Sequence, residues 1–410
     1  MAKRRVVVTG LGLVTPIGMG VTESWKNAIN GVSGITKITK FDSSNFASQV
    51  AGEVKEFDPS QFLPPKEIRR IDPFIQYGLI AGIEAFKDSG IEVNETNAER
   101  IGVAIGSGIG GLGTIENTND TYDESGPRRV SPFFIPGTII NMISGNLSIM
   151  YGLKGPNISI VTACTTGTHC IGDSARMIEY GDADVMIAGG SEAAITELSV
   201  AGFASAKALS SRNDDPATAS RPWDKDRDGF VIGEGAGVMV LEEYEHAKKR
   251  GAKIYAELAG YGMSADAYHI TAPSTDGPKR SMANAVKNAG VNITEVQYVN
   301  AHGTSTPLGD LNETNALKEL FKDHAYNLMV NSTKSMTGHL LGGAGGIESV
   351  FTVLALYNQK SPPTINIFNQ DPECDLDYIP NEARDITAKV ALKNNFGFGG
   401  TNGSLVFKIV

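Results

Sequence analysis

Ser159-Ile-Val-Thr-Ala-Cys164-Thr-Thr-Gly-Thr168 is the stretch that says most about the fold of this chain. An apolar run rich in β-branched residues stops at the cysteine, and small residues then lead into a helical pattern that continues to Tyr180. A cysteine between a strand and a helix lies beside unpaired backbone N–H groups and the positive end of the helix dipole. Both favour the thiolate, so Cys164 is a candidate nucleophile. Buried packing is the alternative, because free cysteine is among the most buried residue types.

Composition narrows the class of protein. The chain has 410 residues, a net charge of −10 and 20% charged residues, which is typical of a globular enzyme large enough for two domains. The negative charge disfavours nucleic acid and anionic membranes as partners. Cys164, Cys170 and Cys374 form no C-x-x-C pair, so neither a zinc site nor a disulfide framework is indicated. We expect a cytoplasmic location, because the chain enters a predicted strand at Arg5 without a signal segment or a membrane-length apolar run.

Short β-branched runs alternate with amphipathic helical patterns along the chain. This alternation predicts helices layered on largely parallel sheets, an α/β fold. The predicted strands are Arg5–Thr9, Ile101–Ile105, Ile158–Ala163, Val185–Ala188, Gly237–Leu241, Tyr255–Leu258, Tyr298–Ala301, Leu328–Asn331 and Ser404–Ile409. The predicted helices are Phe74–Ser89, Cys170–Tyr180, Lys279–Ala289 and Asp310–Phe321.

A weak internal duplication divides the chain. A strand–turn–helix unit at Asn157–Tyr180 has a counterpart at Asn327–Tyr357. The polar segment Glu243–Gly251 lies between the two units. We therefore predict one half over residues 1–250, which carries the candidate nucleophile, and a second half over residues 251–410.

Two histidines in the second half lie in turns of small residues that follow predicted strands. They are His302, within Asn300-Ala-His-Gly-Thr-Ser-Thr306, and His339, within Lys334-Ser-Met-Thr-Gly-His339. Catalytic groups concentrate at such strand ends in α/β folds. Beside a thiolate, two imidazole N–H donors would suit the enolate that forms when a malonyl thioester loses CO2. Structural roles are expected for His246, His269 and His324.

A glycine-rich segment near the C-terminus is a candidate source of further N–H donors. Asn394-Asn-Phe-Gly-Phe398-Gly-Gly-Thr-Asn-Gly403 predicts a tight turn with exposable N–H groups, suited to an oxyanion hole. A packed β-turn is the alternative for this segment.

These motifs together resemble the β-ketoacyl–acyl carrier protein synthases, over nearly the whole chain from Arg4 to Ile409. The matching motifs are Thr162-Ala-Cys-Thr165, His302-Gly-Thr-Ser-Thr306, Lys334-Ser-Met-Thr-Gly-His339 and Asn395-Phe-Gly-Phe-Gly-Gly-Thr-Asn402. The resemblance implies a thiolase-like five-layer αβαβα sandwich of two duplicated halves that forms a homodimer. It also implies chain elongation by decarboxylative condensation, with both substrates carried on acyl carrier protein and no redox cofactor.

The resemblance further implies roles for single residues. Those implied as catalytic are Cys164, His302, His339, Lys334 and Phe398. Among them, Lys334 would pair with Glu348, and Phe398 would supply an oxyanion N–H and gate the malonyl pocket. Substrate contacts are implied for Ile109, Phe133, Phe134, Phe203, Thr304, Thr306 and Phe396, with Ile109 at the end of an acyl tunnel. The acidic carrier protein would bind at Lys66, Arg69, Arg70, Arg128, Arg129 and Lys207.

One position departs from the family pattern. Asn395 stands where the family commonly has serine, within Asn394-Asn-Phe-Gly. The resemblance implies a structural monovalent cation, Na+ or K+, near this loop. The matching candidate ligands are Asn300, Glu348, Asn394 and Asn395.

Other classes of protein fit the sequence less well. Gly106-Ser-Gly-Ile-Gly-Gly111 has the spacing of a dinucleotide-binding loop, but Asn117–Gly126 is polar and predicted to be turn-like where that motif needs a helix. A non-catalytic chain-length factor would lack the cysteine. Initiating synthases carry His and Asn instead of two histidines, and thiolases carry a second cysteine where this chain has Phe396-Gly-Phe-Gly399.

Overall fold

Two sets of five strands with the same connectivity form the framework of the molecule, a computed structural model that describes residues 3–410. The strand order in the N-terminal set is β6 (Asn157–Ile158), β5 (Ile101–Gly106), β7 (Val185–Glu192), β9 (Gly235–Glu243) and β1 (Val6–Thr15). The order in the C-terminal set is β12 (Met329–Asn331), β11 (Tyr298–Asn300), β15 (Val390–Gly397), β16 (Thr401–Lys408) and β10 (Ala256–Ala265). In each set the first three strands are parallel and the last two pairings are antiparallel. The predicted duplication is confirmed.

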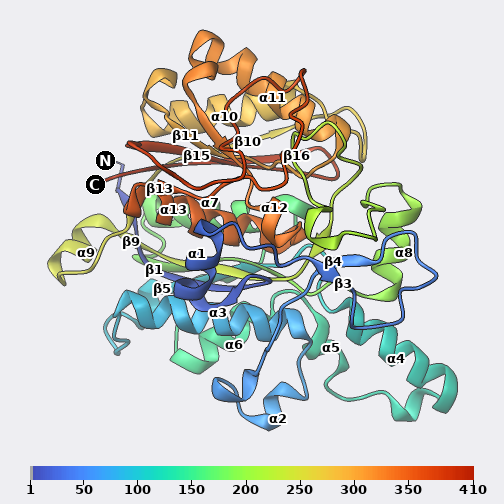
Figure 1. The fold of residues 1–410 in the computed structure, drawn as a ribbon. Helices are drawn as coiled ribbons and strands as arrows, with labels where there is room; N and C mark the ends of the chain where they lie inside the picture. The colour runs from blue at the N-terminus through green and yellow to red at the C-terminus, as the bar shows by residue number, and fades with distance from the viewer. Residues whose placement is uncertain (1–2) are drawn as a thin grey trace.

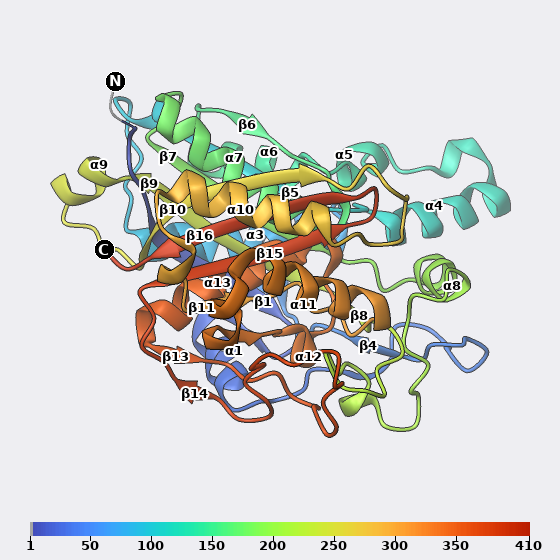
Figure 2. The same cartoon turned by 90° about the horizontal axis from the view of Figure 1, so that it is seen from above.

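Helices cover both faces of each set of strands (Figures 1 and 2). On the outer face of the N-terminal set lie α3 (Pro73–Ser89) and α6 (Met142–Tyr151), and on the outer face of the C-terminal set lie α10 (Asp276–Ala289) and α11 (Pro307–Phe321). Between the two sets, α7 (Thr166–Tyr180) and α13 (Ala344–Asn358) form the central layer and bury the largest apolar cluster. This order of layers is the predicted αβαβα sandwich.

The remaining elements are short or peripheral. The helices are α1 (Gly20–Ile29), α2 (Pro65–Ile68), α4 (Leu112–Ser125), α5 (Phe134–Thr138), α8 (Glu197–Ser205), α9 (Tyr244–Lys249) and α12 (Lys334–Thr337). The strands are β2 (Gly18–Met19), β3 (Thr36–Lys37), β4 (Val50–Gly52), β8 (Ile232–Gly233), β13 (Lys360–Ser361) and β14 (Arg384–Asp385). α9 lies within the polar segment between β9 and β10, where we predict the boundary between residues 1–250 and 251–410.

Glycines allow a helix to approach the first strand of each half closely. A Cβ atom at Gly12 in β1 would lie 1.9 Å from the carbonyl oxygen of Ala81 in α3, and one at Gly262 in β10 would lie 2.2 Å from that of Ser281 in α10. Any side chain at these positions would push the helix off the sheet. The duplication is therefore also visible in the sequence as two matching Gly-x-Gly segments, Gly10-Leu-Gly12 and Gly260-Tyr-Gly262. Sequence reasoning missed this match.

Two predicted elements were wrong. The strand predicted over Ile158–Ala163 ends at Ile158, because β6 lies at the edge of the sheet and the following residues have no partner strand. The turn predicted over Asn117–Gly126 is instead helical, as part of α4. α4 buries none of its residues, so its sequence lacks the apolar stripe by which helices are recognised.

The loop that precedes α4 is nevertheless unsuited to a dinucleotide. The buried carboxylate of Glu192 accepts hydrogen bonds from the N–H groups of Gly108, at 2.9 Å, and Ile109, at 3.1 Å. It thereby holds the N–H groups that a phosphate would need.

Met1 and Ala2, the first residues of the predicted leaderless start, lie outside the described residues. Within residues 3–410, no helix has both the length and the apolar character needed to cross a membrane.

Candidate active site

Cys164 lies in a single 3-10 turn, Ala163–Thr165, directly before α7. Ala163 has a φ of +49°, a left-handed conformation that is unfavourable for a residue with a Cβ atom. The backbone N–H of Thr162 donates to Oγ1 of Thr166 at 2.9 Å and helps to hold this sharp turn. The predicted position of the cysteine at a helix start is therefore confirmed.

Burial dominates the protonation of Cys164. It raises the pKa of the thiol to about 12, whereas the charge of Lys334 and the N–H groups of Phe398 and Cys164 lower it. These N–H groups therefore act in the expected direction, and desolvation of the buried sulfur acts against them. The N–H of Phe398 is the one that the resemblance implies as an oxyanion donor.

A cavity of about 440 Å³ opens onto Cys164 and draws on both halves of the chain. The predicted site residues that line it are Cys164, Phe203, Lys207, His302, Thr304, Thr306, His339, Phe396 and Phe398. The hydroxyl oxygens of Thr304 and Thr306 lie 3.0 Å apart on its wall. The cavity therefore combines a thiol, two imidazoles, hydroxyls and aromatic rings.

His302 and His339 adopt the same tautomer. Nδ1 of His339 accepts a hydrogen bond from the backbone N–H of Leu341 at 3.2 Å. Nδ1 of His302 lies 3.1 Å from the side-chain nitrogen of Asn395, which can only donate. Each neutral ring therefore carries its proton on Nε2. The ring centroids lie 5.3 Å apart, so the two N–H donors belong to one site.

Burial disfavours the charged form of both imidazoles. Burial lowers the pKa of His302 and of His339 well below the ordinary value, and the positive charge of Lys334 lowers both further. A neutral imidazole donates one hydrogen bond without taking a proton from its partner. The pair is therefore suited to stabilise a developing enolate oxygen.

Lys334 forms the ion pair with Glu348 that the resemblance implies. Both side chains are 1% exposed, and the Lys334 ammonium also donates to the backbone carbonyl of His302 at 2.6 Å. An isolated charge at this depth would be strongly unfavourable, so the pair must stay together. The lysine thus fixes the backbone of the turn that carries His302.

The candidate cation ligands do not converge. Asn394 and Asn395 are neighbours in strand β15, so their side chains point to opposite faces. Asn394 accepts from the hydroxyl of Ser404 at 2.9 Å, whereas Asn395 donates to Glu348 at 2.9 Å. Asn394 therefore lies apart from Asn395 and Glu348, and the buried side-chain atoms of Asn300 have no hydrogen-bond partner within residues 3–410.

Sequence reasoning missed several residues that position the histidines. Glu313 accepts from the backbone N–H groups of His302 and Gly303 at 2.9 and 2.8 Å and so holds their turn. Phe230 packs edge-on against His339, and Lys393 is fully buried beside Asn395. The one local signal that could have pointed to Lys393 was a lysine in an otherwise apolar run, Val390-Ala-Leu-Lys393.

His269, which was expected to be structural, lines the mouth of the cavity.

Other predicted residues lie away from the cavity wall. Lys334 lies behind it, whereas Ile109, Phe133 and Phe134 are not among its lining residues. The predicted carrier-binding residues that do not line this cavity are Lys66, Arg69, Arg70, Arg128 and Arg129.

The basic residues on and beside α2 adjoin the start of α5, because the guanidinium of Arg70 lies 4.0 Å from the ring centre of Phe133. Their roles remain predictions.

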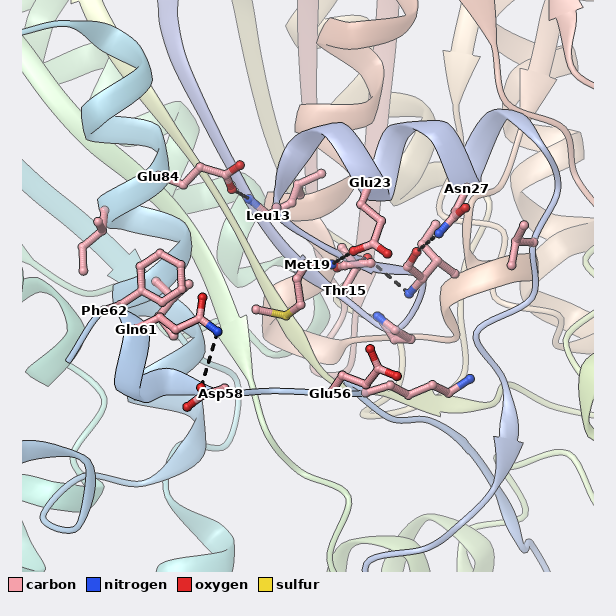
Figure 3. Close-up of a pocket in the computed structure, with 18 of the residues that line it drawn as sticks. Leu13, Thr15, Met19, Glu23, Asn27, Glu56, Asp58, Gln61, Phe62 and Glu84 are labelled. Atoms are coloured by element: carbon pink, nitrogen blue, oxygen red, sulfur yellow. Dashed lines mark hydrogen bonds between the residues drawn. The ribbon is translucent and has the colours of Figure 1, made fainter. Parts of the chain in front are cut away.

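A second cavity, of about 1000 Å³, lies between α1, α3 and the segment around Asp58 (Figure 3). Two of its carboxylates serve local structure. Glu84 accepts from the backbone N–H groups of Leu13 and Val21, and Glu23 accepts from that of Met19. Cys164, His302 and His339 are not among its lining residues, so we place the chemistry in the smaller cavity.

The comparisons with known proteins agree with this geometry. Residues 3–247 match the model of the β-ketoacyl synthase N-terminal domain, and residues 255–368 match that of its C-terminal domain. The chain belongs to the β-ketoacyl synthase family. It is 60% identical to 3-oxoacyl-[acyl-carrier-protein] synthase 2 of Vibrio cholerae, with both chains fully covered. The Vibrio harveyi protein of that name is 59% identical, over 100% of this chain and 99% of its own length.

A solved relative supports the fold as well. The synthase superposes with a TM-score of 0.92 on a type II polyketide ketosynthase that is 38% identical, over the full length of both chains. That relative was solved in complex with its acyl-carrier protein and bound to a hexaketide. The resemblance drawn from the motifs and the thiolase-like architecture are thereby confirmed. The synthase is an acyltransferase, a condensing enzyme of fatty acid elongation.

The tautomers and the neutral state of the two histidines can be tested by nitrogen NMR. In protein labelled with 15N-histidine, we expect His302 and His339 to keep the signals of the neutral Nε2–H form as the pH falls through about 6.5, because burial lowers their pKa values well below that ordinary value. The same histidines in urea-unfolded protein should titrate near pH 6.5. Assignment uses His302→Ala and His339→Ala. Protonation of either ring near pH 6.5 in the folded protein would contradict the geometry.

Proposed function

We propose that this synthase joins an acyl group held on Cys164 to a two-carbon unit derived from malonyl thioester, with both substrates delivered by acyl carrier protein. The convergence of the Cys164 thiol with two neutral Nε2–H imidazoles in one cavity carries this proposal. The product is a 3-oxoacyl thioester two carbons longer. The names of the curated relatives are consistent with these substrates.

In the first step, the sulfur of Cys164 forms a bond to the acyl carbonyl carbon. The carbon–sulfur bond of the incoming thioester breaks, and the carrier leaves as a thiol with the proton that Cys164 gives up. The N–H groups of Cys164 and Phe398 stabilise the oxyanion that forms between these events. Because the resting thiol is neutral, the proton leaves only as the sulfur attacks.

In the second step, malonyl thioester binds with its carbonyl oxygen toward His302 and His339. The bond to the terminal carboxylate breaks, CO2 leaves, and the electron pair forms an enolate whose oxygen accepts hydrogen bonds from both Nε2–H groups. The enolate carbon then attacks the acyl carbonyl on Cys164. The carbon–sulfur bond to Cys164 breaks, and the sulfur takes up a proton from solvent, which replaces the one that left with the carrier thiol in the first step.

Aromatic residues shape the route to these groups. Phe398 is 39% exposed and lies 6.4 Å, centroid to centroid, from Phe203, while Phe396 lies 5.7 Å from His302. We assign Phe398 as the gate between the malonyl and acyl compartments. Thr304 and Thr306 offer hydroxyls to the polar arm of the carrier-bound thioester.

Basic residues suit an acidic carrier. Lys207 lines the cavity mouth, and Lys66 and Arg69 are exposed on and beside α2. Arg128 and Arg129 are exposed in the turn before α5. In a chain of net charge −10, such local positive surfaces give an acidic partner a preferred place to bind.

A homodimer and a cytoplasmic location complete the proposal. β6 ends the N-terminal set of strands, and apolar side chains beside this edge are exposed: Ile149 at 81%, and Met150 and Val161 at 43% and 51%. Proteins normally cover open sheet edges and exposed apolar groups. In this synthase, a second copy of the chain would cover them. A reducing compartment keeps the Cys164 thiol free.

The division of roles predicts separable losses. We expect Cys164→Ala to abolish acyl transfer and condensation while malonyl decarboxylation continues. His302→Ala and His339→Ala should each lower decarboxylation at least about a hundredfold, because one enolate donor is lost, and leave Cys164 open to acylation. Radiolabelled CO2 release and mass mapping of the acyl adduct measure both activities. An adduct on Cys170 or Cys374, or loss of both activities in a folded variant, would overturn the proposal.

The end of the acyl tunnel can be tested at Ile109. Gly108, its neighbour, lies against the carbonyl of Ala163 next to the nucleophile, and Ile109 itself is 37% exposed. Ile109→Phe should lower the rate about tenfold for the longest accepted acyl chains and spare short ones, because the ring fills space rather than touching the chemistry. A series of acyl carrier substrates measures the effect. An unchanged chain-length profile removes Ile109 from the tunnel.

The dimer surface can be tested at Ile149. Replacing this exposed residue by aspartate should leave the fold intact but shift the protein to monomers in light scattering, because a charge would be buried at the interface. Tyr326→Asp, at a 55% exposed position in the C-terminal half, is the control and should stay dimeric. A monomeric parent protein, or a dimeric Ile149 variant, would remove this surface from the interface.

A further inference from the structure

We propose that the side-chain ammonium of Lys393 is the resident cation of this active site and that, through Asn395, it fixes the tautomer and orientation of His302. The inference rests on the proposed role of His302 as an N–H donor to the malonyl thioester. It assigns Lys393 and Asn395 as positioning residues, because neither needs to touch substrate. It also replaces the monovalent metal ion that the resemblance implies.

Lys393 has the surroundings of a bound cation. Its side chain is fully buried in strand β15, and three acceptors face its nitrogen: the hydroxyl of Thr168 at 2.8 Å, the carboxylate of Glu348 at 3.3 Å and the side-chain oxygen of Asn395. Three acceptors match the three N–H bonds of an ammonium group. Thr168 also donates its own proton to the Asn395 oxygen at 2.5 Å, so it must accept from the lysine.

This arrangement leaves the Asn395 amide one orientation. Its oxygen receives hydrogen bonds from Lys393 and Thr168, so its nitrogen must face the other way. There it donates to Glu348 at 2.9 Å and to Nδ1 of His302 at 3.1 Å. A donor at Nδ1 forces the proton of His302 onto Nε2, on the cavity side. Lys393 thus acts on His302 through one rigid amide.

The strand register places Lys393 among the candidate cation ligands. Lys393 is the partner of Asn300 on the neighbouring strand β11, so the two side chains share one face of the sheet. On this face the ammonium of Lys393 contacts Asn395 and Glu348, whereas the buried side-chain amide of Asn300 has no hydrogen-bond partner in the part of the chain that the structure describes. Asn394, the fourth candidate ligand, points to the opposite face and meets Ser404 and Glu313.

Other charges around Lys393 support a positive group. Glu348 on α13 lies between Lys334 on α12 and Lys393 on β15, and it pairs with both. Burial lowers the pKa of Lys393 to about 7, whereas the carboxylate of Glu348 and, at longer range, that of Glu313 on α11 raise it. The two carboxylates offset the two lysines, so the network is close to neutral as a whole.

The first test uses the ring tautomer of His302 as a readout independent of activity. Lys393→Met keeps the length of the side chain and leaves the Lys334–Glu348 pair intact, so the variant should fold. Asn395→Asp replaces the donor at Nδ1 by an acceptor. In both variants we expect the 15N signals of His302 to shift toward the Nδ1–H form, while those of His339, which bonds to Leu341, stay unchanged. Decarboxylation should fall at least about tenfold.

The matched control is Lys389→Met, at an exposed lysine just before β15, which should change neither signal nor rate. A His302 ring that keeps its Nε2–H signal in both active-site variants would overturn the inference. That result would leave the proposed function untouched, because the function is tested by the His302→Ala variant.

The second test varies the cation. We expect decarboxylation and thermal stability of the parent protein to be the same in choline, Na+, K+ and ammonium chlorides at equal ionic strength. Lys393→Ala, which opens space for an ion, should be less active in choline and recover severalfold in K+ or ammonium. A parent protein that requires Na+ or K+, or a Lys393→Ala variant fully active in choline, would overturn the assignment of Lys393 as the resident cation.

Discussion

The buried carboxylate of Glu348 is the interaction on which the active site depends. It is 1% exposed and pairs with Lys334 and Lys393 while accepting from the amide of Asn395. Charges at this depth are tolerated only when each is matched, so no member of the group can move alone. Lys334 fixes the backbone at His302, and Asn395 fixes its ring. The enolate donors are thus in place before substrate arrives, which is what electrostatic stabilisation requires.

The duplication explains why nucleophile and donors meet. In each half a 3-10 turn leads into a central helix, α7 in one and α13 in the other, and each turn begins with a left-handed residue, Ala163 at φ +49° and Leu341 at φ +48°. A Cβ at Gly167 would lie 2.6 Å from the backbone nitrogen of Gly346, so the two helix starts touch. One turn presents Cys164, and the other presents an N–H to His339.

Local sequence was enough for the parts of the site that depend on one segment. Cys164, His302 and His339 each lie in a segment of small residues, and that pattern is readable without the fold. In the structure only His302 comes directly after a strand, β11, whereas His339 follows α12 and β6 ends well before Cys164. The contact of Asn395 with His302 was not, because β15 reads as a glycine-rich turn and was missed as a strand. Once β15 is known, its two-residue period places Lys393 and Asn395 on one face and Asn394 on the other. Helix α4 was missed for a different reason: it buries none of its residues, so its sequence has no apolar stripe.

The raised pKa of Cys164 also bears on how the enzyme survives between turnovers. Peroxide and other electrophiles react with thiolates far more readily than with thiols. A sulfur that stays protonated until an acyl thioester is positioned against its N–H donors is a poor target for such reagents. Desolvation of the nucleophile therefore gives it chemical protection, because it lowers the fraction of the sulfur present as thiolate.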